Sequence, residues 1–360
     1  MAGSGYVHKA WVLSGDYLRF YFGTAYAILV MDAVLAMATR TTYNNNCFGE
    51  TSPTCMLKQS GSGLCAVSGE DRLTPESRAM EVTQICEGFG ADISDVDLAA
   101  LTGSAFEAIY ATWLKYGVLR FKGQSLDKAS LQTFSQRFGP LEQLPTGRMT
   151  EEQKAQLDNL YVTPISNIKV DGKPIGGLGD AEAAWHSDMT YIETPPPASV
   201  LLGVEIPENG GDTFFVDQRA ALTGLPEDLR VRIQDLTIKH NAAHDSVGKL
   251  RHGFEPFDDP RMAPGAVHPI VRRHNETGDE CLYLGRRDWA YIPGLSLEDS
   301  EALLDELWAY AIPSAFVVEQ NWTPGDVIIW DNRRCLHRRT AIDPSQRRLL
   351  LRCQVLDRAA

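Results

Sequence analysis

Residues 185–188 of the chain read Trp-His-Ser-Asp, and a further histidine, His337, follows late in the sequence. Strand side chains alternate in direction, so a His-x-Asp tripeptide on a strand presents its imidazole and its carboxylate on one face. One distant histidine completes a set of two imidazoles and one carboxylate. The pattern predicts a metal site formed by His186, Asp188 and His337.

Two histidines and one carboxylate make up the facial triad of non-haem Fe(II) oxygenases, which leaves three coordination positions open. The tripeptide alone is weak evidence, because short matches arise by chance. Its weight comes from the motifs that accompany it in order: Trp185–Tyr191, Gly210–Thr213, Trp330–Arg333 leading to His337, and Gln346–Arg348 with Arg352. With these motifs the chain resembles the taurine/2,4-dichlorophenoxyacetate dioxygenase family of Fe(II)- and 2-oxoglutarate-dependent oxygenases, from about Val82 to about Gln354.

The resemblance implies roles for individual residues. His186, Asp188 and His337 would hold Fe(II), and 2-oxoglutarate and O₂ would be the co-substrates. Arg348 and Thr213 would hold the distal carboxylate of 2-oxoglutarate. Arg352 matches the position that grips the substrate anion, with Tyr191, Arg286 and Arg287 as further candidates for substrate contact.

The last expected strand gives an argument of its own. Arg348, Leu350, Arg352 and Gln354 share one face by alternation, and the residues between them form an apolar face. A row of donors facing a core would be costly unless an anion lies there. Two nearby guanidinium groups repel unless two anions are present, so the second anion is expected to be the substrate. The alternative is that Arg352 pairs with a carboxylate of the protein.

Composition narrows the classes of partner. The apolar fraction of 44% is ordinary for a soluble globular protein, and 360 residues can bury a full core. The net charge of −13 argues against nucleic acid, whose phosphates need a basic footprint. Eight arginines between Arg333 and Arg358 depart from this acidity. They are either a solvated basic face or a pocket for anions, which arginine binds bidentately.

Cysteine usage and the N-terminal region bear on location. Seven cysteines, without a Cys-x-x-Cys pair, favour reduced thiols and a cytoplasmic protein over a disulfide framework.

Residues 1–79 do not match the family and are expected to be a peripheral extension, or an over-long gene start. Their apolar run Phe20–Ala38 allows a membrane span, a signal segment or a buried helix. Because Asp32 interrupts the run, no stable membrane insertion is expected.

Residues 80–360 are expected to form the catalytic domain. Val82–Ile85 and Arg347–Leu356 read as strands, Ser94–Tyr116 has helical spacing, and Ser296 caps a helix through Trp308. Many strands with short turns and flanking helices predict a mainly β domain of the double-stranded β-helix (jelly-roll) type. Residues 145–157 and 239–264 read as long loops that suit lids over a site.

The sequence therefore predicts a dioxygenase that hydroxylates a C–H bond of a small, anionic organic molecule and releases succinate and CO₂. An intact Asp188 favours hydroxylation over halogenation, because related halogenases replace this carboxylate. Two alternatives remain at this point: a zinc hydrolase, which uses similar ligands, and a jelly-roll binding protein without catalysis. A homo-oligomer is compatible with the sequence.

Overall fold

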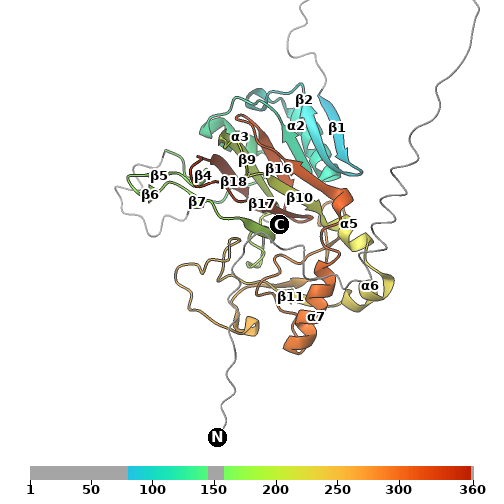
Figure 1. Cartoon of the computed structure of the whole chain (residues 1–360). Helices are drawn as coiled ribbons and strands as arrows, with labels where there is room; N and C mark the ends of the chain where they lie inside the picture. The colour runs from blue at the N-terminus through green and yellow to red at the C-terminus, as the bar shows by residue number, and fades with distance from the viewer. Residues whose placement is uncertain (1–79, 145–157, 358–360) are drawn as a thin grey trace, which may run out of the picture. The chain divides into compact units, whose positions relative to one another are not determined.

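A computed structural model describes residues 80–144 and 158–357. The chain divides between Asp71 and Arg72, and all of the described residues belong to the second unit. This unit is mainly β with flanking helices, as the sequence predicted (Figure 1).

Two sheets form the centre of the unit. The first has eight strands in the order β1 (Glu81–Cys86), β2 (Phe89–Ser94), β3 (Val118–Phe121), β16 (Val327–Asp331), β9 (Ala198–Glu205), β18 (Leu349–Val355), β4 (Thr163–Ser166) and β7 (Gly177–Leu178). The second has four strands in the order β15 (Val317–Gln320), β10 (Thr213–Asp217), β17 (Cys335–Arg339) and β8 (Ala183–His186). Neighbouring strands are antiparallel except for the pairs β2–β3 and β4–β7.

Shorter elements surround these sheets. Three further strand pairs are β5 (Lys169–Val170) with β6 (Lys173–Pro174), β11 (Thr237–Lys239) with β12 (Val267–Pro269), and β13 (Val271–Arg273) with β14 (Glu280–Leu282). The α-helices of the described residues are α2 (Gly103–Tyr116), α3 (Lys128–Gln136), α5 (Gln218–Thr223), α6 (Glu227–Ile233) and α7 (Leu297–Trp308). Short 3₁₀ turns are η2 (Leu98–Ala100), η3 (Pro260–Met262) and η4 (Ser314–Phe316).

Alternation along the strands divides the apolar side chains among three clusters. Ile328 of β16 belongs to a cluster that draws on both sheets, together with Phe215 of β10, whereas its neighbours Val327 and Ile329 pack with helices α2 and α3. A third cluster joins Leu336 of β17 to helices α5, α6 and α7. Each sheet therefore has helices against one face, and the other face meets the partner sheet.

Local predictions were confirmed where capping or alternation was unambiguous. Ser296 caps α7 by accepting the amide of Asp299, and β18 has the two faces that the sequence predicted. The predicted helix from Ser94 was wrong in its start, because α2 begins at Gly103 with Thr102 as its cap. Ser94 is instead the last residue of β2, which pairs with both β1 and β3. Residues 98–100 form the separate 3₁₀ turn η2, so the apolar spacing that predicted one long helix belongs to two elements.

Among the residues that the structure describes, no helix is long and apolar enough to cross a membrane. The predictions for Phe20–Ala38 and for a lid at 145–157 fall outside these residues.

A buried ionic network ties the first sheet to the β13–β14 hairpin. Asp331, at the end of β16, is completely buried and accepts hydrogen bonds from His274 (2.8 Å) and from Arg333 (2.8 and 2.7 Å). Burial alone would raise the pKa of this carboxyl, but Arg333 and His274 hold it well below its usual range. His274 lies in the turn of the hairpin, so this carboxylate fixes the hairpin to the sheet.

The substitution Asp331→Asn is expected to lower the free energy of unfolding by about 3–5 kcal/mol, because it removes the buried charge partner of Arg333 and leaves only Glu276, whose side chain is 32% exposed. Urea unfolding would measure the loss. The matched control is Asp305→Asn, whose side chain is 72% exposed in its pair with Arg287 and should contribute less than about 1 kcal/mol. Equal losses in the two variants would contradict this account.

Candidate active site

Pairing between β8 and β17 brings the two predicted histidines together. The strands are antiparallel, and His186 lies directly opposite His337. Their ring centroids are 4.1 Å apart. Asp188 completes the group, with its Oδ1 3.7 Å from Nε2 of His186 and 3.8 Å from Nε2 of His337. One ligand atom from each of the three residues lies within 4.8 Å of the others.

Asp188 reaches this position from a turn and not from a strand face. Strand β8 ends at His186, so the alternation argument for the tripeptide was wrong in detail. Asn332, which is buried, holds the turn from both sides of the Asp188 backbone. Its Oδ1 accepts the amide of Asp188 (2.7 Å), and its Nδ2 donates to the Asp188 carbonyl (2.8 Å). The motif Trp330–Arg333 was noticed in the sequence, but this role of Asn332 was not.

The protonation states suit a divalent metal ion. His186 donates its Nδ1–H to the carbonyl of Ala184 (2.7 Å), which leaves the Nε2 lone pair facing Asp188. Burial lowers the pKa of both imidazoles, that of His337 to about 3, so both are neutral at pH 7. Burial would raise the pKa of Asp188, but neighbouring His337 and Arg352 lower it to about 2. Neutral imidazoles and an ionised carboxylate are the forms that bind metal.

The three residues line a cavity of about 490 Å³. Thr213, Tyr191, Arg348 and Arg352, all predicted as site residues, line the same cavity. The expected insertion 239–264 supplies part of the wall through a separate group of side chains: His240, Asn241, Asp245, Ser246 and Arg251. Its role as a lid remains a prediction.

Arg348 is a buried cation that lacks a carboxylate partner among the described residues. Its Nη2 donates to the carbonyl of Gly211 (2.9 Å), while its Nε is buried without a partner in the described part of the chain. Burial, together with the nearby charge of Arg339, lowers the pKa of Arg348 to about 9. An anion in the cavity would supply the missing partner and raise the pKa of Arg348 again.

Thr213 is oriented by a residue that the sequence reasoning missed. The indole N–H of Trp322 donates to Oγ1 of Thr213 (3.0 Å). Since an indole nitrogen can only donate, Thr213 accepts this bond and its own hydroxyl hydrogen stays available for another acceptor. Thr213 and Arg348 thus both offer donors to the cavity.

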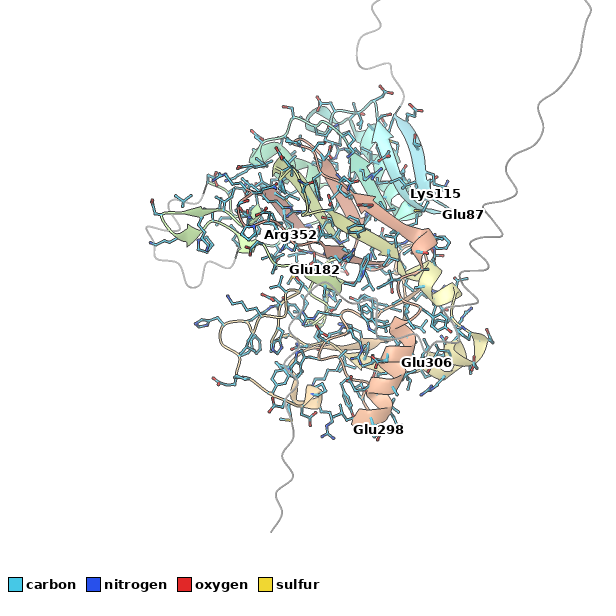
Figure 2. All side chains as sticks on the ribbon, in the orientation of Figure 1. Glu87, Lys115, Glu182, Glu298, Glu306 and Arg352 are labelled. Atoms are coloured by element: carbon cyan, nitrogen blue, oxygen red, sulfur yellow. The ribbon has the colours of Figure 1, made fainter. Side chains whose placement is uncertain are left out.

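The predicted substrate residues are placed differently from one another. Arg352, labelled in Figure 2, has its Nη1 3.7 Å from Oδ2 of Asp188, so it already has a protein carboxylate nearby. Tyr191 lines the cavity, and the guanidinium of Arg251 lies 4.2 Å from its ring centroid. Arg286 also lines the cavity, but its two Nη atoms donate to the carbonyls of Asp245 and His244.

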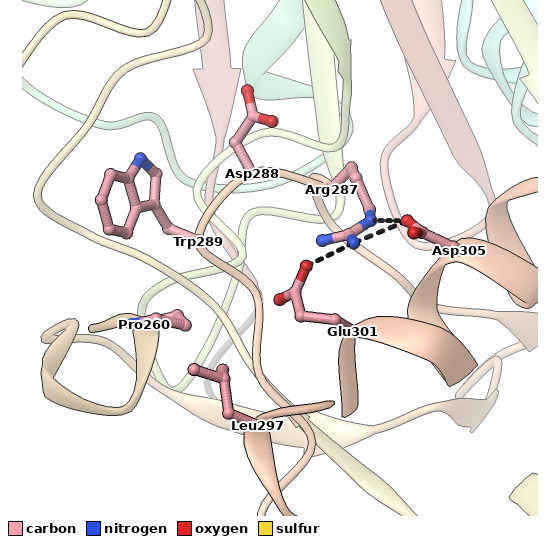
Figure 3. Close-up of a pocket in the computed structure, with 7 residues that line it drawn as sticks. All are labelled: Pro260, Arg287, Asp288, Trp289, Leu297, Glu301 and Asp305. Atoms are coloured by element: carbon pink, nitrogen blue, oxygen red, sulfur yellow. Dashed lines mark hydrogen bonds and ion pairs between the residues drawn. The ribbon is translucent and has the colours of Figure 1, made fainter. Parts of the chain in front are cut away.

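Arg287 is not part of this cavity, which corrects the expectation that it contacts substrate. It faces a separate surface pocket and forms ion pairs with Glu301 and Asp305, each at 2.6 Å (Figure 3). Arg286 pairs with His186 in a β-bridge, whereas Arg287 lies at the bend that begins the following turn, so the two neighbouring side chains reach different pockets.

The cavity is cationic although the chain is acidic. Its described lining contains five arginines (Arg251, Arg286, Arg339, Arg348 and Arg352) against three carboxylates (Glu142, Asp188 and Asp245). A divalent metal would add two positive charges. The surroundings therefore favour anionic ligands, in contrast to the net charge of −13 of the whole chain.

Two imidazoles and a carboxylate beside a cavity with an unpaired arginine are the features of a metal-dependent enzyme that takes an anionic co-substrate. Residues 81–354 match the family described as taurine catabolism dioxygenase TauD, TfdA family, and the chain belongs to that family.

Named relatives agree with this assignment. The chain is 32% identical over 280 residues to an (S)-phenoxypropionate/alpha-ketoglutarate-dioxygenase of Sphingobium herbicidovorans, covering 76% of this chain and 94% of the relative. It is 32% identical over 283 residues to an alpha-ketoglutarate-dependent 2,4-dichlorophenoxyacetate dioxygenase of Cupriavidus pinatubonensis, covering 75% and 96%. The crystal structure of AAD-2 in complex with Mn(II) and N-oxalylglycine is similar, with a TM-score of 0.63 at 26% identity, over 78% of this chain and 99% of that one. The chain is an oxidoreductase of the 2-oxoglutarate-dependent dioxygenase class.

Replacing any one of His186, Asp188 and His337 by alanine is expected to abolish tight Mn(II) binding, because each removes one of three protein ligands. Titration calorimetry with the purified variants would measure the loss. The control is His252→Ala, an exposed histidine outside the cavity, which should bind Mn(II) as the unaltered protein does. Wild-type affinity in any of the three variants would remove that residue from the ligand set.

Proposed function

We propose that the protein is an Fe(II)- and 2-oxoglutarate-dependent dioxygenase that hydroxylates a C–H bond of a small anionic organic molecule. In the reaction, O₂ is consumed and 2-oxoglutarate is converted to succinate and CO₂. The observation that carries the proposal is one cavity with the His186, Asp188 and His337 ligand atoms together with the buried, unpaired cation of Arg348.

The ligand set fits Fe(II) and leaves coordination positions on the cavity side for a co-substrate. Fe(II) and 2-oxoglutarate, when bound, supply the oxidising chemistry, and the protein supplies position and charge. Arg348 and Thr213 would hold the distal carboxylate of 2-oxoglutarate through a charged and a neutral hydrogen bond. The buried apolar side chains of Leu201 and Trp330, which also line the cavity, would exclude water from the reacting carbon.

An anionic substrate is favoured by the charge of the cavity. The dianion 2-oxoglutarate would offset the charge of the metal ion, and the described arginines would still outnumber the carboxylates. Arg352 is the candidate residue for binding the substrate anion. Its Nη1 lies 3.7 Å from Oδ2 of Asp188, and a bound metal ion would neutralise part of the charge of that carboxylate. Relatives named for phenoxypropionate, for 2,4-dichlorophenoxyacetate and for sulfate esters support a substrate of this kind.

For the architecture, we propose that the two central sheets form a double-stranded β-helix and that residues 80–360 are the whole catalytic domain. All of the candidate site residues lie after Met80. A chain that begins at Met80 is therefore expected to express in soluble form and bind Mn(II) as the full chain does. Insoluble expression would show that residues 1–79 are needed for folding.

Arg348→Met is expected to raise the KM for 2-oxoglutarate by roughly 100-fold or more, since losing one partner of a buried charge pair costs several kcal/mol. Thr213→Val should raise it less, because only a neutral donor is lost. Succinate formation at varied 2-oxoglutarate would give both values. Arg347→Ala is the matched control, an exposed neighbour paired with Glu205. An unchanged KM in Arg348→Met would contradict the co-substrate assignment.

Anionic compounds, including sulfonates, sulfate esters, carboxylates and aryloxyalkanoates, are expected to stimulate 2-oxoglutarate consumption more than their neutral isosteres. Arg352→Gln should reduce this preference by about 10-fold or more, because a guanidinium–anion pair is lost. Oxygen uptake across a panel of matched anions and isosteres would measure the preference. Neutral isosteres that are turned over as fast as the anions, in both proteins, would show that the charge argument is wrong.

A further inference from the structure

Two buried polar residues lie opposite one another on neighbouring strands of the first sheet. Ser199 on β9 and Gln354 on β18 are direct cross-strand partners and are 0% and 3% exposed. On the same face, Ser199 is flanked by the buried side chains of Leu201 on β9 and Trp330, its cross-strand partner on β16. Burying polar groups in such surroundings costs free energy unless the groups are hydrogen-bonded.

The two side chains form a chain of hydrogen bonds that ends on Asp188. Gln354 Nε2 lies 2.7 Å from Oγ of Ser199, and Ser199 Oγ lies 2.9 Å from Oδ2 of Asp188. A carboxylate only accepts, so the single hydroxyl hydrogen of Ser199 goes to Asp188. Gln354 must then donate with its amide nitrogen, which fixes the direction of the whole chain.

The hydrogen bond from Ser199 gives the two carboxylate oxygens of Asp188 different surroundings. Oδ1 is the atom nearest to Nε2 of both histidines, at 3.7 and 3.8 Å. Oδ2 instead accepts from Ser199 and lies 3.7 Å from Nη1 of Arg352. A carboxylate whose second oxygen is engaged in this way offers a metal ion a single oxygen.

We propose that Ser199 and Gln354 are positioning residues that hold Oδ2 of Asp188 away from the metal ion and so enforce monodentate ligation through Oδ1. This rests on the proposed metal site. A bidentate carboxylate would occupy a second position, and the facial triad needs the remaining three for its co-substrates. Groups that orient metal ligands typically change metal affinity or activity by about 10–100-fold when they are removed.

Mn(II) binding to the purified protein tests the proposal without substrate or turnover. In Ser199→Ala, Mn(II) affinity should fall by about 10–100-fold, and the electron paramagnetic resonance spectrum of bound Mn(II) should change because Oδ2 is released. Binding of 2-oxoglutarate to the Mn(II)-loaded protein should also weaken. Ser199→Thr keeps the hydroxyl and should restore the wild-type spectrum.

Two further variants separate positioning from general loss of a buried polar group. Gln354→Met keeps the Ser199 hydroxyl and should shift the spectrum in the same direction, with a smaller loss of affinity. Ser135→Ala removes another fully buried hydroxyl, which donates to the carbonyl of Leu131 in α3 and lies on the far side of the first sheet from Asp188, and should leave both readouts unchanged.

Wild-type affinity and spectrum in both Ser199→Ala and Gln354→Met would overturn the positioning role while leaving the metal site intact. The same would hold if Ser135→Ala changed the spectrum as much as Ser199→Ala. Absence of Mn(II) binding by the unaltered protein would overturn the metal site itself, and the positioning role with it.

Discussion

The register between β8 and β17 is the constraint on which the site depends. It sets His186 directly opposite His337, so their imidazoles meet on one face of the four-stranded sheet. A shift of one residue would send one ring to the opposite face, since strand side chains alternate. Asp188, the third candidate metal ligand, lies beyond the strand and must be positioned by other contacts. Asn332 provides these contacts by bonding both sides of the Asp188 backbone.

Burial and charge then act together on the groups around the ligands. Burial keeps the imidazoles of His186 and His337 neutral. Arg348 is also buried, and it has no carboxylate partner in the described part of the chain. Arg339, which also lines the cavity, donates instead to the carbonyls of Gly179 and Leu178. Two buried guanidinium groups near one another are unfavourable in an empty cavity. The same pair of guanidinium groups becomes favourable when a carboxylate binds between them. The two arginines therefore favour binding of an anionic ligand.

Much of the site was predictable because its chemistry is carried by residue types that have few other uses in an interior. His186, His337, Arg348 and Arg352 stand out in the sequence as buried or strand-borne polar groups, and the structure brings them to one cavity. The mainly β fold followed from short alternating segments with frequent turns. The start of α2 was predicted too early because Leu98 and Leu101 fit the helical spacing of the residues that follow, whereas Leu98 belongs to the separate turn η2 and Thr102 caps α2.

Other features depend on contacts between distant residues, which a single sequence does not reveal. Ser199 and Gln354 are 155 positions apart, and Thr213 and Trp322 are 109 apart. Each is an unremarkable residue until strand pairing joins it to its partner. Arg286 and Arg287 are neighbours of identical chemistry, and the direction of the local backbone alone decides which one faces the cavity.

The most direct test of the central claim is an anaerobic titration of 2-oxoglutarate into the Fe(II)-loaded protein, followed by visible absorption. Chelation of Fe(II) by the keto acid produces a metal-to-ligand charge-transfer band, which Zn(II) cannot give because it has no redox chemistry. The account predicts a band that saturates at one equivalent and is absent with Zn(II). A protein that binds Fe(II) but develops no such band at saturating 2-oxoglutarate would contradict it.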